Sequence, residues 1–125
     1  MIKYIEILSN KTIKIYKTTE VEVLNLSFEK YLNVLLLKDL TTFNGRIEAI
    51  KKKYKYKKLV PIYIDDTMCF IPVENIEYNS IYINAYSIYK ITYQKIIFID
   101  GSSLSIYKNL KTISNNINRA KAIKK

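Results

Sequence analysis

The sequence has no histidine, and among its 125 residues it has only one cysteine and two glycines. Without histidine, it lacks the side chain that most often transfers protons near neutral pH. Cys69 alone can neither close an internal disulfide nor complete a structural zinc site. Two glycines are too few for loops that cradle phosphates, and no P-loop or dinucleotide-binding fingerprint is present. We therefore expect no enzymatic activity, no catalytic residues, no metal and no cofactor.

Long apolar runs are also missing. The longest, residues 32–37, contains Asn33 and ends at Lys38, whereas a membrane helix needs about 20 apolar residues. The first residues include Glu6 and lack the apolar centre of a signal peptide. A lone cysteine fits a reducing compartment. These features predict a cytoplasmic protein with no membrane-spanning helix, and we expect no membrane partner.

Acidic residues are absent from two segments of a chain whose net charge is +10. Residues 51–58 read Lys-Lys-Lys-Tyr-Lys-Tyr-Lys-Lys and carry six positive charges, and residues 101–125 carry six more. Subtracting these twelve charges leaves the rest of the chain with a net charge of −2. Solubility alone does not require such segregation. It favours an anionic partner, with nucleic acid as the first candidate. The alternative interpretations are a solvated face and contact with a membrane surface.

The candidate DNA-binding residues follow from this charge, and we call residues 51–58 the basic block. They are Arg46, Lys51, Lys52, Lys53, Lys55, Lys57 and Lys58, with a second contact at Lys121, Lys124 and Lys125. Gly45-Arg46 has another interpretation, in which Gly45 is a turn residue and Arg46 a surface donor. Most tyrosines lie in strand patterns, so only Tyr54 and Tyr56 are candidates for a nucleic-acid surface.

The N-terminal part of the chain alternates between apolar and polar residues. This pattern predicts strands at Ile2–Leu8, Thr12–Lys17 and Glu20–Leu26. Ser27 fits an N-cap, and apolar residues at helical spacing then predict a core-facing helix near residues 28–38. The segment Thr41–Gly45 is expected to break this helix as a turn.

A second helix is expected near residues 45–56, running into the basic block. Ile47, Ile50 and Tyr54 would face the core and leave the lysines outward. Glu48, Ala49 and the lysines favour a helix over the alternative, a strand at Lys53–Lys58. A C-terminal amphipathic helix is expected near residues 109–123, with a polar face of Lys, Asn and Arg and an apolar face of Leu110, Ile113, Ile117 and Ala120.

Short strands are predicted between these helices, at Val60–Ile64, Met68–Ile71, Ile81–Ile83, Ile88–Tyr93, Ile96–Ile99 and Leu104–Tyr107. Turns at Asp65–Thr67 and Asp100–Ser102 join two hairpins, Pro72 ends a strand, and Glu74–Ser80 is a polar loop. We expect Asp65 and Asp66 to form the turn and not a catalytic pair. The elements predict an α+β fold: a small single domain, residues 1–125, mainly antiparallel β-sheet with two central helices and a basic C-terminal helix.

Several landmarks follow one another in order between Thr41 and about residue 123. They are Gly45-Arg46, the basic block, Lys58-Leu59-Val60-Pro61-Ile62, Cys69-Phe70-Ile71-Pro72, Ser80-Ile81-Tyr82-Ile83-Asn84, Ile88, Asp100-Gly101 and a C-terminal helix with Arg119. In this order they resemble the competence transcription factor (ComK) family. Ser80 and Tyr82 stand where the family has cysteine and tryptophan.

The resemblance implies a DNA-binding transcriptional activator that binds A/T-rich duplex DNA mainly through the minor groove and works as a homo-oligomer. A basic surface suits this mode, because narrow A-tract minor grooves concentrate negative potential. Two alternatives stay open at this point. One is a protein–protein interaction module that modulates a longer homologue through sheet edges and the C-terminal helix. The other is an RNA- or single-strand-binding β domain.

Overall fold

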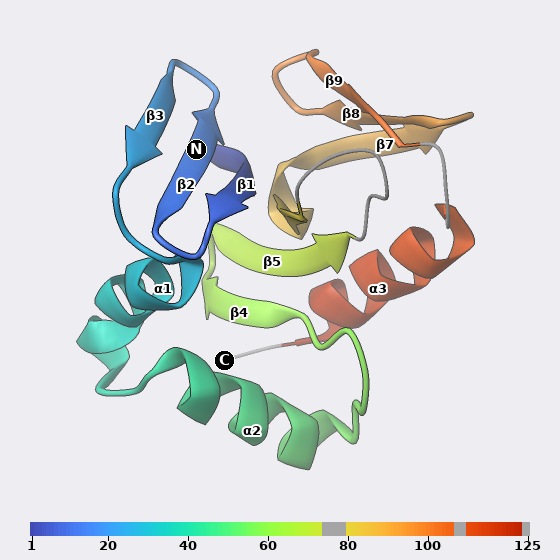
Figure 1. Ribbon diagram of the computed structural model, residues 1–125. Coiled ribbons are helices and arrows are strands. Elements are labelled where there is room, and N and C mark those ends of the chain that lie inside the picture. Colours follow the sequence, from blue (N-terminus) through green and yellow to red (C-terminus); the bar gives the residue numbers. More distant parts are fainter. Residues whose placement is uncertain (74–79, 107–109, 124–125) are drawn as a thin grey trace.

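Two antiparallel sheets and three α-helices form the computed structural model, which describes residues 1–73, 80–106 and 110–123 (Figure 1). The larger sheet, in the order β3-β2-β1-β6-β5-β4, consists of β1 Ile2–Ser9, β2 Thr12–Lys17, β3 Val21–Leu24, β4 Ile62–Asp65, β5 Met68–Val73 and β6 Ile81–Asn84. The smaller sheet consists of β7 Ile88–Thr92, β8 Lys95–Phe98 and β9 Ser103–Ser105. The helices are α1 Phe28–Leu36, α2 Phe43–Tyr54 and α3 Leu110–Ala122. The expected α+β architecture is confirmed, while the predicted loop Glu74–Ser80 lies outside the described residues except for Ser80.

The six-stranded sheet buries apolar side chains on both faces, because successive residues of a strand point to opposite sides. On β5, Phe70 joins one core, while its neighbours Cys69 and Ile71 join the other. The first core includes Leu32 of α1, and the second includes Ile117 of α3 and residues of the small sheet. The sheet is therefore the middle layer, with α1 on one face and α3 with the small sheet on the other (Figure 1).

The start of α2 differs from the prediction of a turn at Thr41–Gly45. Thr42 is the N-cap, and its hydroxyl accepts a hydrogen bond of 3.1 Å from the Gly45 N–H. Gly45 thus lies in the first helical turn, where an added Cβ would approach the Thr41 hydroxyl to 2.8 Å. Close packing, and not a turn conformation, accounts for this glycine. The helix ends at Tyr54, so the alternative strand at Lys53–Lys58 is wrong.

Pro72 does not end a strand, because β5 continues through it to Val73. Pro72 pairs with Tyr82 of β6, but the paired residues of β4 reach only as far as Ile62, opposite Phe70. At Pro72 the strand therefore has a partner on one side only, and there a missing N–H is tolerated as on an edge strand. The predicted turn at Asp65–Thr67 is confirmed, with the Thr67 N–H donating to Asp65 Oδ1 at 2.8 Å.

One buried polar side chain joins several of these elements. Asn84, at the end of β6, is fully buried. Its Nδ2 donates to the carbonyls of Ile2 and Thr67 at 2.8 and 2.9 Å, and its Oδ1 accepts from the N–H groups of Cys69 and Tyr86, each at 3.1 Å. Asn84 thus ties β1, the β4–β5 turn, β5 and the segment after β6 to one point.

We predict that Asn84→Ala lowers the free energy of unfolding by about 3 kcal/mol, because four backbone groups lose the partner that this fully buried side chain provides. In thermal denaturation the melting temperature should fall by about 10 °C. Asn118→Ala, at an exposed position of α3, is the matched control and should change it little. Equal melting of the two variants would contradict the role of Asn84.

Candidate nucleic-acid interface

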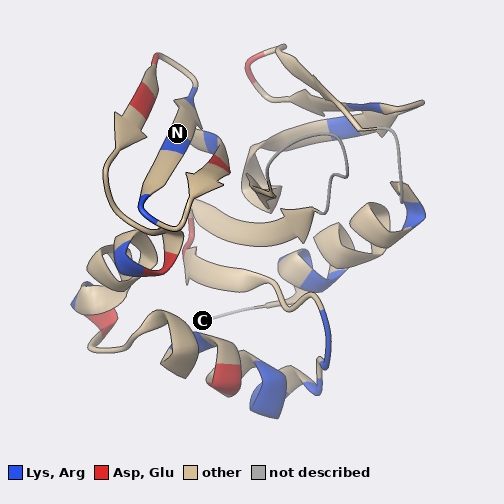
Figure 2. Cartoon of the chain, in the orientation of Figure 1, with Lys and Arg blue, Asp and Glu red and all other residues tan. Residues whose placement is uncertain are grey.

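The basic block begins on a helix and ends on an irregular segment. Lys51–Lys53 form the last turn of α2, and Lys55 takes a left-handed C-cap conformation with φ of 62°. The lysines that follow lie on the connection from α2 to β4, where blue marks the chain in Figure 2. The exposed members of the block are Lys52, Lys53, Lys55, Lys57 and Lys58. The block therefore presents a row of ammonium groups to solvent.

Helix α3 fixes the backbone of this segment. Arg119 donates hydrogen bonds to the Lys58 carbonyl at 3.0 Å and to Asn116 Oδ1 at 3.2 Å, and its guanidinium lies 4.1 Å from the centre of the Tyr56 ring. Asn116 donates to the Leu59 carbonyl at 2.9 Å, and the Tyr56 hydroxyl donates to the Arg119 carbonyl at 3.3 Å. We call these contacts the α3 clamp. They hold two consecutive carbonyls and leave the Lys57 and Lys58 side chains exposed.

Sequence reasoning missed Asn116 and assigned it to the polar face of the last helix. It is 2% exposed and lies among the apolar contacts of α3. The helical spacing could have predicted that Asn116 is buried. Asn116 follows Ile113 by one helical turn and precedes Ile117 and Ala120 on the same apolar stripe. A polar residue within an apolar stripe needs a buried partner, which here is the Leu59 carbonyl.

The two tyrosines of the block are used for packing. Tyr54 and Tyr56 stack on each other with ring centres 5.7 Å apart, and both pack against the core that includes Ile117 of α3. Arg119 also contacts the Tyr56 ring. We therefore do not place these two rings at the nucleic-acid surface.

Arg46 is likewise engaged inside the protein. Its side chain is 15% exposed, forms an ion pair with Asp39 and donates to the Tyr63 carbonyl at 3.2 Å. It lies in the first turn of α2, about two helical turns before the lysines of the last turn. The structure therefore gives Arg46 a role in joining α2 to β4, and we leave it out of the interface.

The remaining predicted residues lie at the C-terminal end of α3. Lys121 is exposed in the last turn, close in sequence to Arg119 of the clamp. Lys124 and Lys125 lie outside the described residues. Lys111, at the other end of α3, is also exposed, and α3 has no acidic residue. The helix thus extends the positive surface away from the basic block.

Ion pairs neutralise positive side chains elsewhere in the described part of the chain. Asp100 pairs with Lys3, Glu20 and Glu22 with Lys17, and Asp65 with Lys38. Burial alone would raise the pKa of Asp65, but hydrogen bonds from Lys38 and Thr67 outweigh it and hold the pKa at about 2. Within the block, the described ion pair is Lys51 with Glu48 at 3.7 Å, where Glu48 is 73% exposed and the attraction is weak.

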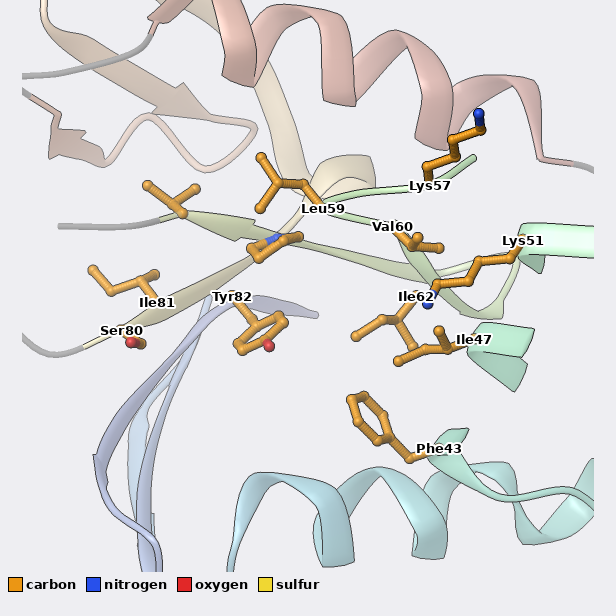
Figure 3. Close-up of a pocket in the computed structure, with 12 residues that line it drawn as sticks. Phe43, Ile47, Lys51, Lys57, Leu59, Val60, Ile62, Ser80, Ile81 and Tyr82 are labelled. Atoms are coloured by element: carbon orange, nitrogen blue, oxygen red, sulfur yellow. The ribbon is translucent and has the colours of Figure 1, made fainter. Parts of the chain in front are cut away.

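A pocket of about 380 Å³ lies beside the block, between α2 and the larger sheet (Figure 3). Phe43, Ile47 and Ile62 give it apolar walls, and Lys51 extends across it, while the ammonium of Lys57 points away. The described residues that line it include neither a carboxylate nor a histidine.

Cys69 does not add a nucleophile. It is fully buried, and burial raises the pKa of its thiol to about 12, so the thiol stays protonated at neutral pH. Within the described residues, no three side chains of His, Cys, Asp or Glu come together as a metal site. In the same part of the chain, no helix has the length and apolar composition needed to span a membrane.

The comparisons with protein-family models, curated proteins and solved structures gave no match for this chain.

We predict that Arg119→Ala loosens the connection after α2, because the Lys58 carbonyl and the Tyr56 ring lose their partner. Trypsin should cut after Lys57 and Lys58 several-fold faster, because the free energy of local opening falls by about 1 kcal/mol. Limited digestion followed by mass spectrometry measures these cleavage rates. Asn115→Ala, at an exposed position of the same helix, should leave the cleavage rate unchanged. An unchanged rate in Arg119→Ala would show that the clamp does not order this segment.

Proposed function

We propose that the protein is a DNA-binding transcriptional regulator that contacts A/T-rich duplex DNA through the basic block and the exposed face of α3. The observation that carries the proposal is the row of exposed lysines in the block, held on a backbone that the α3 clamp fixes. Lysines at fixed positions meet phosphates with a smaller loss of conformational entropy than lysines on a mobile tail. Each phosphate that is neutralised releases counterions and adds affinity.

The distribution of acids supports this choice over a solvated face. Outside the interface, several basic side chains are matched by carboxylates, as described above. In the interface, α3 contributes no acid, and Glu48 is the acidic neighbour within α2. A protein that needed lysine only for solubility would mix the two signs there as well. The lysines of the last turn also offset the negative end of the α2 dipole, but this requires only one or two charges.

The proposed preference for A/T-rich sequences rests on the resemblance of the ordered landmarks to the competence transcription factor family and on a physical argument. A narrow A-tract minor groove has a strongly negative potential and attracts basic side chains without base-specific hydrogen bonds. The basic block is rich in such side chains. Members of that family activate transcription, and we propose the same direction of regulation here.

We predict that Lys52→Ala/Lys55→Ala weakens binding to every duplex by about tenfold and lowers the slope of log affinity against log salt by about one per lost phosphate contact. The ratio of A/T-tract to G/C affinity should survive, because groove width sets it. Electrophoretic mobility shifts at several salt concentrations measure both quantities.

The matched control is Lys11→Ala/Lys30→Ala, which removes the same charge from exposed positions on the β1–β2 turn and α1. It should keep the wild-type affinity and slope. If the two double variants behave alike, the block is a solvated face and the assignment fails. Tighter binding of wild type to single-stranded RNA or DNA than to any duplex would instead favour the single-strand-binding alternative.

Self-association is part of the proposal. Strand β3 is an outer strand of the larger sheet, and its Val21 and Val23 side chains are 52% and 55% exposed. An outer strand offers unpaired backbone groups to another strand, and exposed valines add apolar area to such a contact. We propose that two copies of the chain associate through β3.

We predict a dimer or larger assembly at tens of micromolar in sedimentation velocity, with and without DNA. Val23→Lys should shift the protein toward the monomer, because a lysine on an outer strand blocks pairing. Val34→Lys is the control, since Val34 is 65% exposed on α1. A monomeric wild-type protein, or dissociation caused by both variants alike, would rule out β3 as the contact.

A further inference from the structure

The outer face of the small sheet carries lysines and serines and no acidic residue from its strands. Ile91 pairs with Ile96, which also pairs with Leu104, and these three side chains face the core. The alternate positions point the other way. Those outer positions are Lys90, Thr92, Lys95, Ile97, Ser103 and Ser105, of which all but Thr92 and Ile97 are exposed. The strands contribute no acidic residue to this face.

Two tyrosines border the same face. The pairing of β7 with β8 shifts between Ile88 and Lys90, which leaves Tyr89 as the extra residue of a β-bulge, and Tyr89 is 69% exposed. Its ring lies 5.9 Å from the Lys90 ammonium. Tyr93, in the turn that joins β7 to β8, is 84% exposed. The other tyrosines of the described chain are buried or half-buried. The hairpin therefore holds two aromatic rings in solvent beside two lysines.

The position of this face relative to the basic block follows from α3. The last strand of the sheet leads through the buried Ile106 toward the first turn of α3, where Leu110 packs against the same core. Arg119, nine residues further along α3, holds the block. At 1.5 Å per residue, the two ends of this stretch are about 14 Å apart. Helix α3 therefore runs from the core beneath the small sheet to the basic block, and a duplex that lies along α3 would pass both surfaces.

We propose that the outer face of the β7–β9 sheet is a base-stacking site for the same A/T-rich duplex. Tyr93 and Tyr89 place their rings against bases that open at a flexible base step, and Lys90 and Lys95 neutralise the flanking phosphates. Aromatic rings stack on any base, and steps such as TA unstack at little cost. The nearby carboxylate of Asp100 does not repel the DNA strongly, because Lys3 pairs with it at 3.1 Å. The site rests on the proposed DNA-binding function and adds the bases to the phosphate contacts of the block.

The test compares wild type with Tyr89→Ala/Tyr93→Ala on an A/T-rich duplex that carries 2-aminopurine at a central TA step. Wild type should raise the 2-aminopurine fluorescence, which reports unstacking. The variant should lose this rise and bind about tenfold more weakly or worse, since each stacked base contributes substantially to affinity. Its salt slope should stay at the wild-type value, because no charge is removed. Tyr89→Phe/Tyr93→Phe should restore both readouts, since the rings return.

The controls separate this site from the basic block. Leu40→Ala removes a side chain that is 90% exposed elsewhere and should change neither affinity nor fluorescence. Because both tyrosines are exposed, the alanine variant should keep the wild-type melting temperature. Wild-type binding that is unchanged in the folded alanine variant would overturn the stacking site and leave the proposed function standing. If the alanine variant lost affinity only for single-stranded DNA, the stacking site on the duplex would be overturned. A wild-type protein that binds no DNA would overturn both proposals.

Discussion

The arrangement of the larger sheet depends on the hydrogen bonds of one buried amide, that of Asn84. Strand β6 joins two parts of the chain that are far apart in sequence, the N-terminal strands through β1 and the β4–β5 hairpin through β5. Asn84 is fully buried and satisfies backbone groups from both parts, and each of its side-chain polar atoms has partners there. Such a fully bonded network fixes one register, because a slipped strand would leave these groups unpaired.

Hydrogen bonds from side chains to the backbone also order the segment that carries the basic block. Closely spaced lysines repel one another, and a segment rich in them tends to stay disordered. An acidic residue could have held the segment, but it would have cancelled part of its charge. Here Arg119 and Asn116 bind its carbonyl groups, so the clamp adds a positive charge and no negative one. Order and positive potential are thereby obtained together, which is what a surface that binds phosphates requires.

The sequence predicted the elements well where one periodicity dominated. The alternation in β1 to β3 and the apolar stripe of α3 marked these elements close to their observed ends. It failed where a tertiary contact decided the outcome. Gly45 looked like a turn residue but packs against Thr41. Pro72 is tolerated in β5 because the pairing of β5 with β4 does not extend beyond Phe70. For the site, charge located the exposed lysines of the block, but only the fold could reveal that Arg46 is paired with Asp39 and that α3 holds the segment.

Two residues of the connection after α2 have left-handed backbones, Lys55 with φ of 62° and Leu59 with φ of 50°. For residues other than glycine this conformation costs roughly 1 kcal/mol or more each, and glycine would adopt it freely. At position 55 the backbone adopts this conformation with a lysine, whose side chain is exposed and carries a positive charge. A sequence optimised for stability alone would have glycine there. At this position the backbone conformation favours glycine, whereas the DNA binding that we propose would favour lysine.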